Sequence, residues 1–247
     1  MPRCTRKVKL VRHTVEPEAL TALGARLCYA GGDVEKLLTA IEQKDQRAFV
    51  EKIMSMGHES VLEHVSFTFL IEGVSRVLLA QLTRHRIASF SVQSQRYVSY
   101  ASGFGYIIPP AIEALGEEAV DEYEAQMAQM QSWYEGWQQK LGAAGEKSNE
   151  DARFVLPNAC ETRVLMTMNA RELRHFLALR MCSRAQWEIR QMANDMFEQV
   201  VRVAPAMFRD AGPGCLRGAC PEGEKSCGKA RQIREERQAF LAHEELN

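Results

Sequence analysis

The sequence predicts an α/β (α+β) protein that forms one domain, and three observations support this prediction. Segments rich in β-branched and aromatic residues alternate along the chain with segments in which apolar residues recur every three or four positions. No internal repeat and no clear linker divides the 247 residues, a length that suits one large domain. Hydrophobic residues make up 46% of the chain and charged residues 26%, which is typical of a folded soluble protein.

The first half of the chain is expected to contain two strands and several helices. The β-branched and aromatic residues of SFTFLIE predict a strand over residues 66–72, and residues 7–15 predict another. Apolar residues at helical spacing predict helices over residues 17–30, 34–41, 46–54 and 75–85. The spacing then changes to alternation, and Phe90, Val92, Val98 and Tyr100 predict an extended segment.

The second half of the chain is expected to be mainly helical. The clearest helix covers residues 116–141, where apolar residues recur at spacings of three and four. A packed core or a subunit interface explains this stripe better than an aromatic-binding site does. A strand over residues 162–168 precedes a helix that begins near Asn169, and Asn169 with Glu172 forms a capping pattern. A last long helix covers residues 185–204.

The predicted domain spans residues 1–212, and residues 213–247 form a Cys-containing, charged C-terminal tail. The tail holds Cys215, Cys220 and Cys227, whose spacings of five and seven differ from the short pairs of most zinc sites. No fourth ligand is evident, and the segment 57–64 (GHESVLEH) does not complete a zinc-protease motif. No metal site is therefore expected.

The balance of charge argues against a dedicated nucleic-acid binder. The formal net charge is −1, from 31 basic and 32 acidic residues, whereas proteins that neutralise many phosphates carry a basic excess. No apolar run approaches the roughly 18–20 residues that cross a bilayer, and the N-terminus lacks the apolar core of a signal peptide. We therefore expect a cytoplasmic protein that binds neither nucleic acid nor membrane.

The segment 81–97 contains the densest group of polar side chains. Its arginines are Arg84, Arg86 and Arg96, and several hydroxyl-bearing residues lie among them. Arginine guanidiniums and hydroxyls suit phosphate oxygens. Arg84-His85-Arg86 alone would fit a solvated basic helix end, which the helix dipole favours. The serines and glutamines that follow shift the interpretation to an anion-binding site.

Five blocks of this sequence resemble blocks of the flavin-dependent thymidylate synthases. Arg84-His85-Arg86-x-x-Ser89-x-x-x-x-Ser94-x-Arg96 resembles the signature of that family. The others, in the order and approximate spacing of the family, are residues 57–64 (GHESVLEH), 152–157 (ARFVLP), 169–180 (NARELRHFLALR) and 185–189 (AQWEI).

The resemblance implies a function, a fold and an assembly. Members of the family methylate dUMP to dTMP, with methylenetetrahydrofolate as the carbon donor and FAD reduced by NADPH, and release tetrahydrofolate. The fold would be a single domain with a central, mostly antiparallel sheet flanked by long helices. FAD would be the cofactor, and dUMP, folate and NADPH would be the partners of a homotetramer with shared active sites.

The resemblance also implies which residues form the binding sites. The residues that would bind dUMP are Gln81, Leu82, Thr83, Arg84, Val92, Gln93, Ser94, Gln95, Arg96, Arg153 and Arg180. The residues that would bind FAD are His58, Ser60, Arg84, His85, Arg86, Asn169, Ala170, Arg171 and His175. Many members carry Asn-Glu where this chain has Ser91-Val92, so any contact made by that glutamate side chain is missing here.

Arg180 and Ser94 are the expected catalytic residues. Leu173, Phe176, Leu177 and Arg180 share one face of the expected helix. An arginine on an apolar face needs an anionic partner, unless its end reaches solvent. In the family the matching arginine favours ionisation of uracil N3, and a permanently protonated guanidinium stabilises that charge. Ser94 is expected to position dUMP without attacking it, because the sequence shows no histidine–acid pair that would activate it.

Two other functions remain open from the sequence. A flavoprotein of the same fold would bind flavin and dUMP without methylating the nucleotide. A nucleic-acid-binding module would use the basic segments around Arg84 and Arg96, although the balanced charge argues against it.

Overall fold

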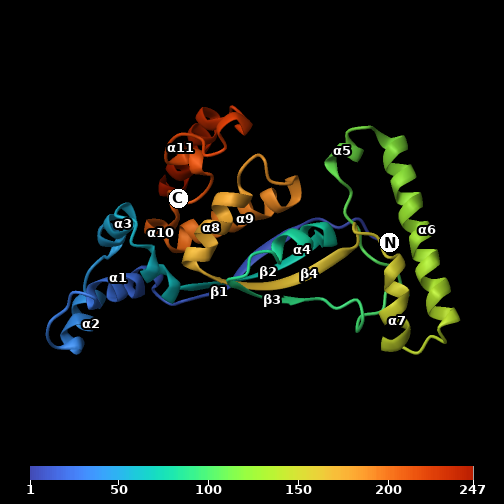
Figure 1. Cartoon of the computed structure of the whole chain (residues 1–247), viewed down its shortest axis with the longest axis horizontal. Helices are drawn as coiled ribbons and strands as arrows, with labels where there is room; N and C mark the ends of the chain where they lie inside the picture. Colours follow the sequence, from blue (N-terminus) through green and yellow to red (C-terminus); the bar gives the residue numbers. More distant parts are fainter. Residues whose placement is uncertain (247) are drawn as a thin grey trace. The chain divides into compact units, whose positions relative to one another are not determined.

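The backbone combines a four-stranded antiparallel sheet with helices, so the predicted mixed class is confirmed. Figure 1 shows the computed structural model, which describes residues 1–246. The strands are β1 (Lys7–His13), β2 (Ser66–Ser75), β3 (Ala88–Val92) and β4 (Glu161–Asn169), in the spatial order β1-β2-β4-β3. Thr68 hydrogen-bonds to Thr167 at 2.9 Å, and Gly73 N–H donates to Glu161 at 3.1 Å. Strands β2 and β4 therefore run in opposite directions.

The chain divides into two compact units, and the boundary falls within or beside the strands. Unit 1 comprises Met1–Val8, Leu70–Arg84 and Phe90–Met166. Unit 2 comprises Lys9–Phe69, His85–Ser89 and the described chain from Thr167 onward. Each unit has its own group of buried apolar side chains.

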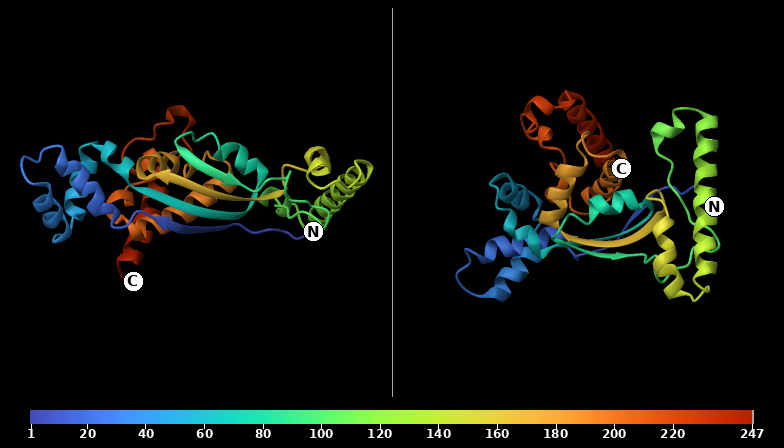
Figure 2. Two further views of the ribbon diagram at one scale, coloured as in Figure 1. Left: turned by 90° about the horizontal axis from the view of Figure 1, so that it is seen from below. Right: turned by 45° about the vertical axis from the view of Figure 1, so that its right-hand side comes forward.

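Unit 1 is built around one long helix. Its helices are α4 (Arg76–Leu82), α5 (Pro110–Glu113), α6 (Glu117–Lys140) and α7 (Glu146–Ala152). Helix α6 lies beside α7 (Figures 1 and 2), and it confirms the helix predicted over residues 116–141. Met127 and Tyr134 of its apolar stripe are buried in a core with Tyr100 and Phe104.

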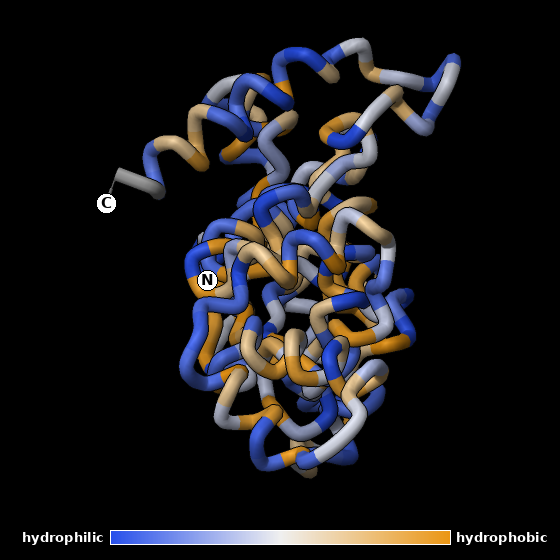
Figure 3. Tube along the Cα trace, turned by 90° about the vertical axis from the view of Figure 1, so that its left-hand side faces the viewer, coloured by the Kyte–Doolittle hydropathy of each residue, from blue (hydrophilic) through white to orange (hydrophobic). Residues whose placement is uncertain are grey.

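Within the described residues, unit 2 contains seven α-helices, including α8, which borders the site described below. They are α1 (Pro17–Leu27), α2 (Val34–Glu42), α3 (Arg47–Ser55), α8 (Ala170–Arg180), α9 (Trp187–Val203), α10 (Pro205–Phe208) and α11 (Ala230–Leu246). Helix α8 packs on α9, whose predicted stripe is fully buried at Ile189, Met192, Met196 and Val200. Helix α11 mixes hydrophilic with hydrophobic residues along its length (Figure 3).

Several elements are shorter than the sequence predicts: β1 ends at His13 and α1 at Leu27, and α4 and β3 are also shorter. Helix α4 ends at Leu82, because the hydroxyl and N–H of Thr83 both donate to the Leu79 carbonyl at 3.0 Å and close the last turn. Strand β3 ends at Val92, because Ser94 forms a turn: its carbonyl accepts from Val98 N–H at 3.0 Å.

Three helices were not predicted. Helices α5, α7 and α10 are too short to show a helical period in the sequence. Among the described residues, no helix combines the length and apolar character that crossing a membrane requires.

Candidate functional site

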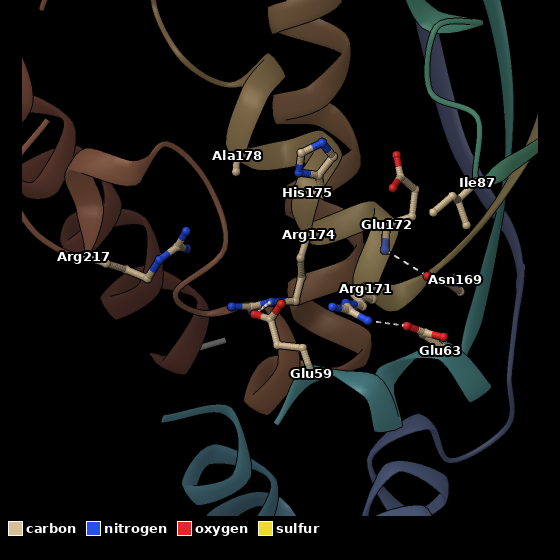
Figure 4. Close-up of a pocket in the computed structure, with 10 residues that line it drawn as sticks. All are labelled: Glu59, Glu63, Ile87, Asn169, Arg171, Glu172, Arg174, His175, Ala178 and Arg217. Atoms are coloured by element: carbon tan, nitrogen blue, oxygen red, sulfur yellow. Dashed lines mark hydrogen bonds and ion pairs between the residues drawn. The ribbon is translucent and has the colours of Figure 1, made fainter. Parts of the chain in front are cut away.

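Unit 2 contains a cavity of about 540 Å³ beside the start of α8. Small-molecule and cofactor sites commonly have volumes of about 300–1,000 Å³, so the size suits such a ligand. Figure 4 shows this α8 cavity, which is lined by Glu59, Glu63, Ile87, Asn169, Arg171, Glu172, Arg174, His175, Ala178 and Arg217. The structure thus brings together three residues expected to bind FAD, namely Asn169, Arg171 and His175.

The first turn of α8 borders this cavity, and the N–H of Ala170 donates to the Val65 carbonyl at 2.8 Å. Asn169 Oδ1 accepts from the N–H of Glu172 at 2.8 Å, which confirms the predicted capping role. The first N–H groups of a helix have no partner within the helix, and the helix dipole favours an anion there. Arg174 Nε is buried and makes no hydrogen bond, and it lies 3.7 Å from Glu59 Oε1.

Two arginines of α8 bring positive charge to the cavity, and both contact carboxylates. Arg171 Nη1 lies 2.5 Å from Glu63 Oε1, and both side chains are about half exposed. Arg174 is buried, and its two Nη atoms donate to Asp210 at 2.7 and 3.0 Å. Exposed ion pairs contribute little to stability, so Arg171 can exchange Glu63 for an anionic ligand at small cost. Arg174 is fixed in place.

A buried row of side chains connects this cavity to Arg180. Glu172 Oε1 lies 3.0 Å from His85 Nδ1, and Arg180 Nε lies 3.1 Å from His85 Nε2. A guanidinium can only donate, so His85 Nε2 accepts, and the ring proton lies on Nδ1 and is donated to Glu172. The row therefore holds a neutral His85 in one tautomer and orients Arg180.

The surroundings of His85 favour this neutral form. Burial lowers the pKa of His85 below its ordinary value, and the charge of Arg180 acts in the same direction against the opposing effect of Glu172. The ring also packs edge-on against Phe176, with 4.9 Å between ring centroids.

Most residues expected to bind dUMP lie in unit 1 and differ in exposure. Thr83 and Arg84 are exposed, whereas the half-buried members are Gln81, Val92, Gln93, Ser94, Arg96 and Arg153. Leu82 is fully buried, and the buried Gln95 donates to Cys160 Sγ at 3.6 Å. These two residues can therefore contact a ligand only through their backbones. Arg180, the remaining member, belongs to unit 2.

Arg96 is held by acidic side chains and by a buried polar network of α6 and α7. Its guanidinium lies 2.5 Å from Glu146 and 3.7 Å from Glu150. Its carbonyl accepts from Asn149 Nδ2 at 3.1 Å, and Asn149 Oδ1 accepts from the Tyr134 hydroxyl at 3.2 Å. Because Tyr134 and Asn149 are buried, this network fixes the backbone of the loop that carries Arg96.

Ser94 is engaged in the same loop. Its Oγ accepts from the N–H groups of Arg96 at 3.2 Å and of Tyr97 at 3.5 Å. Such serine turns order the backbone locally. This geometry suits a positioning role and gives the hydroxyl no partner that would activate it as a nucleophile among these contacts.

The other residues expected to bind FAD lie in several places. His58 and Ser60 line a second cavity of about 560 Å³, together with Phe49, Ile53 and Met56. The residues of this second cavity come from α1 to α3, from the segments that follow α1 and α3, and from the turn η1 (Glu59–His64). The side chain of Ala170 is buried, and Arg86 is exposed.

The cysteines of the C-terminal tail do not form a ready-made metal site. Cys215 and Cys220 line a separate cavity of about 430 Å³ with Cys182. Within residues 1–246, no three histidine, cysteine, aspartate or glutamate side chains are arranged to hold a metal ion. The absence of a metal site stays a prediction.

Sequence reasoning missed several residues that line the α8 cavity. Arg174 carried a signal, because it lies next to Leu173 and four residues after Ala170 on the buried side of the helix, where an arginine needs a partner. Glu172 was identified only as part of the capping pattern. Glu63 lies in the block 57–64 that resembles the family but received no role, and Arg217 lies outside the resembling blocks.

Comparisons with known proteins show which proteins this chain resembles. The family profile described as thymidylate synthase complementing protein matches residues 9–206. The flavin-dependent thymidylate synthase of Geobacter sulfurreducens is 52% identical and aligns over 92% of this chain and 96% of its own length. That of Clostridium tetani is 47% identical, over 92% and 95%.

One solved structure resembles the fold at modest sequence identity. It is the UMP/dUMP methylase PolB from Streptomyces cacaoi, crystallised with 5-Br dUMP. The TM-score is 0.65 at 26% identity, over 83% of this chain and 94% of that chain.

Proposed function

The chain belongs to the family of flavin-dependent thymidylate synthases, and from this membership we propose how its residues serve the reaction. The enzyme methylates dUMP to dTMP, with methylenetetrahydrofolate as the carbon donor and FAD reduced by NADPH. The observation that carries the residue assignment is the α8 cavity and its buried connection, through Glu172 and His85, to Arg180.

The α8 cavity fits a flavin nucleotide. Its walls combine the start of α8, where the helix dipole favours an anion, with the side chains of Arg171, Arg174 and His175, which suits phosphate oxygens and the polar edge of a ring. When bound, the flavin supplies the reducing equivalents that turn a transferred methylene into the methyl group of dTMP. His58 and Ser60 in the second cavity would contact another part of the same dinucleotide or of a co-substrate.

Arg180 stabilises the uracil ring in the form that reacts. Its guanidinium remains protonated, so it stabilises negative charge at uracil N3 but does not remove the proton. His85 accepts from Arg180 Nε at 3.1 Å and restricts the direction of the guanidinium. Positioning of this kind lowers the barrier, because the donor is already aimed when charge develops.

Residues of unit 1 hold the nucleotide. Arg84 is exposed, and Arg153 Nε donates to the carbonyl of Glu150 at 3.0 Å, so both guanidiniums are candidates for the dUMP phosphate. Ser94 and the backbone of Val92 to Arg96 orient the nucleotide. Val92 contributes no carboxylate, so its contact is made by the backbone.

The proposed function is tested first with the purified protein and its visible absorption spectrum. A flavin spectrum that shifts when dUMP is added, followed by dTMP formation with NADPH and methylenetetrahydrofolate, is the expected result. A protein that binds FAD and dUMP tightly but forms no dTMP would be a nucleotide-binding flavoprotein instead. A protein that takes up no flavin would contradict the cofactor assignment.

A homotetramer is proposed, and α6 supplies the face that supports it. Trp133 and Trp137 lie four residues apart on this helix and are 52% and 47% exposed. Exposed aromatic side chains on one helix face commonly mark protein–protein contacts. Light scattering of the purified protein should give the mass of four chains, and a monomeric mass would exclude the proposal. The cytoplasmic location and the tail boundary at residue 213 stay predictions.

A further inference from the structure

Arg217 lines the α8 cavity from a part of the chain that the family signature does not include. The cavity contains three arginines. Arg171 contacts Glu63, and Arg174 contacts Asp210 and lies 3.7 Å from Glu59. Arg217 donates from Nη1 to the backbone carbonyl of Asp210 at 2.7 Å. Among the described residues, no carboxylate lies within ion-pair distance of Arg217.

The charged residues of the cavity show why the contacts of Arg217 differ in importance from those of Arg171 and Arg174. Its arginines Arg171, Arg174 and Arg217 face the carboxylates Glu59, Glu63 and Glu172. Glu172 is engaged by His85, and the other two glutamates lie near the arginines of α8. A ligand anion would have to displace a carboxylate from Arg171. Arg217 contacts Asp210 through the backbone carbonyl, and its charge acts on the Asp210 carboxylate from beyond ion-pair distance.

The backbone around Arg217 is fixed by two arginines of α11. Arg234 donates from Nε to the carbonyl of Cys215 at 2.7 Å and from Nη2 to the carbonyl of Gly218. Arg237 donates from Nη1 to the carbonyl of Ala211. These bonds tie the turn η3 (Gly214–Leu216) to α11 on both sides. Arg217 therefore approaches the cavity from an ordered segment, on the side of Arg174 away from Arg171 (Figure 4).

We propose that Arg217 binds a phosphate of the flavin nucleotide in the α8 cavity, which makes the C-terminal tail part of the cofactor site. The proposal rests on the assignment of this cavity to flavin under the proposed function. A guanidinium presents paired N–H donors that match phosphate oxygens, and the dipole at the start of α8 favours an anion in the same cavity. Two separate segments of unit 2 thus favour a phosphate there.

The test is a flavin-binding titration of the full chain after its bound flavin has been removed. Arg217→Ala should bind FAD at least about tenfold more weakly than the natural sequence, since a hydrogen bond to a charged group typically contributes a factor of this order. Arg217→Lys should give an intermediate affinity, because it keeps the charge but loses the paired donors. Riboflavin, which has no phosphate, should bind equally to all three proteins.

Arg231→Ala provides the matched control, because Arg231 belongs to the same tail, is exposed, and pairs with Glu235 on α11. This variant should bind FAD as the natural sequence does. Unchanged FAD affinity in Arg217→Ala would overturn the proposal while leaving the proposed function intact. An equal loss of FAD and riboflavin affinity would also overturn it, because the effect would then not involve phosphate. Failure of the natural sequence to bind any flavin would instead contradict the proposed function.

Discussion

The two units hold their functional residues in place in different ways. In unit 2 the expected cofactor residues surround a cavity, and ion pairs such as Arg174–Asp210 fix its walls. In unit 1 the expected substrate residues Gln93 to Arg96 lie on a loop, and buried hydrogen bonds of Tyr134 and Asn149 fix the backbone of that loop. The difference teaches that ion pairs fix the proposed cofactor site, whereas hydrogen bonds to the backbone fix the proposed substrate loop.

The largest effect on turnover is expected for Arg180→Ala, at the end of the row Glu172–His85–Arg180 beside the α8 cavity. Loss of one preorganised donor to a developing negative charge typically reduces turnover on the order of 100-fold or more. The rate of dTMP formation at saturating dUMP should fall by this amount while bound flavin is retained. Arg184→Ala is the control, since Arg184 pairs with Glu222 and is not among the residues of the α8 cavity. Loss of flavin together with turnover in Arg180→Ala would show that the two sites are not separable.

Asn149→Ala tests the hydrogen-bond network that fixes the loop of Arg96 in unit 1. The substitution removes the donor to the Arg96 carbonyl and leaves the buried Tyr134 hydroxyl without this acceptor. The free energy of unfolding should fall by about 1–3 kcal/mol, and KM for dUMP should rise with little change in FAD affinity. Asn158→Ala, at an exposed position, should change neither quantity. An unchanged KM would mean that the loop is positioned without the network.

The stability of unit 2 should depend on the protonation of His85. Its pKa in the folded state is lowered by burial, so the unfolded state binds this proton more readily. The free energy of unfolding should therefore be unaffected by His85 above its ordinary pKa of about 6.5 and should fall as the pH decreases below that value. His85→Gln should make this part of the pH profile flatter in denaturant titrations. An equally steep profile in the variant would assign the effect to other groups.

The smallest effect is expected for Glu63→Gln, a substitution in the lining of the α8 cavity. The pair of Glu63 with Arg171 is about half exposed, so its loss should change the free energy of unfolding by less than about 1 kcal/mol. Arg171 would no longer be neutralised, and FAD affinity should increase slightly. Glu122→Gln on the exposed side of α6 is the control. Weaker FAD binding in Glu63→Gln would show that the carboxylate itself contacts the ligand.

The regular elements could be predicted because their residues carry a period. The stripes of α6 and α9 and the cap at Asn169 were evident from spacing and residue type, and the structure confirms them. The helix α7 could not be predicted, because seven mostly polar residues show no apolar face. The partners of Arg96 were missed with it, since Glu146 and Glu150 lie on that helix.

The site could be predicted only in part, because contacts between distant segments leave no local pattern in the sequence. The resemblance identified Asn169, Arg171 and His175, which share one cavity in the structure. It did not indicate that Arg96 is engaged by carboxylates or that Glu172 contacts His85. Contacts between segments far apart along the chain depend on tertiary packing, and one sequence without relatives does not encode them in any local pattern.

The row Glu172–His85–Arg180 has a thermodynamic consequence for the two ligands. Glu172 lines the cofactor cavity, and Arg180 is the proposed partner of the uracil ring. A ligand that restricts Glu172 also restricts Arg180 through His85, so the ordering required for the second ligand is partly complete. Cooperativity between binding sites is reciprocal. The factor by which bound flavin increases the affinity for dUMP must therefore equal the factor by which bound dUMP increases the affinity for flavin.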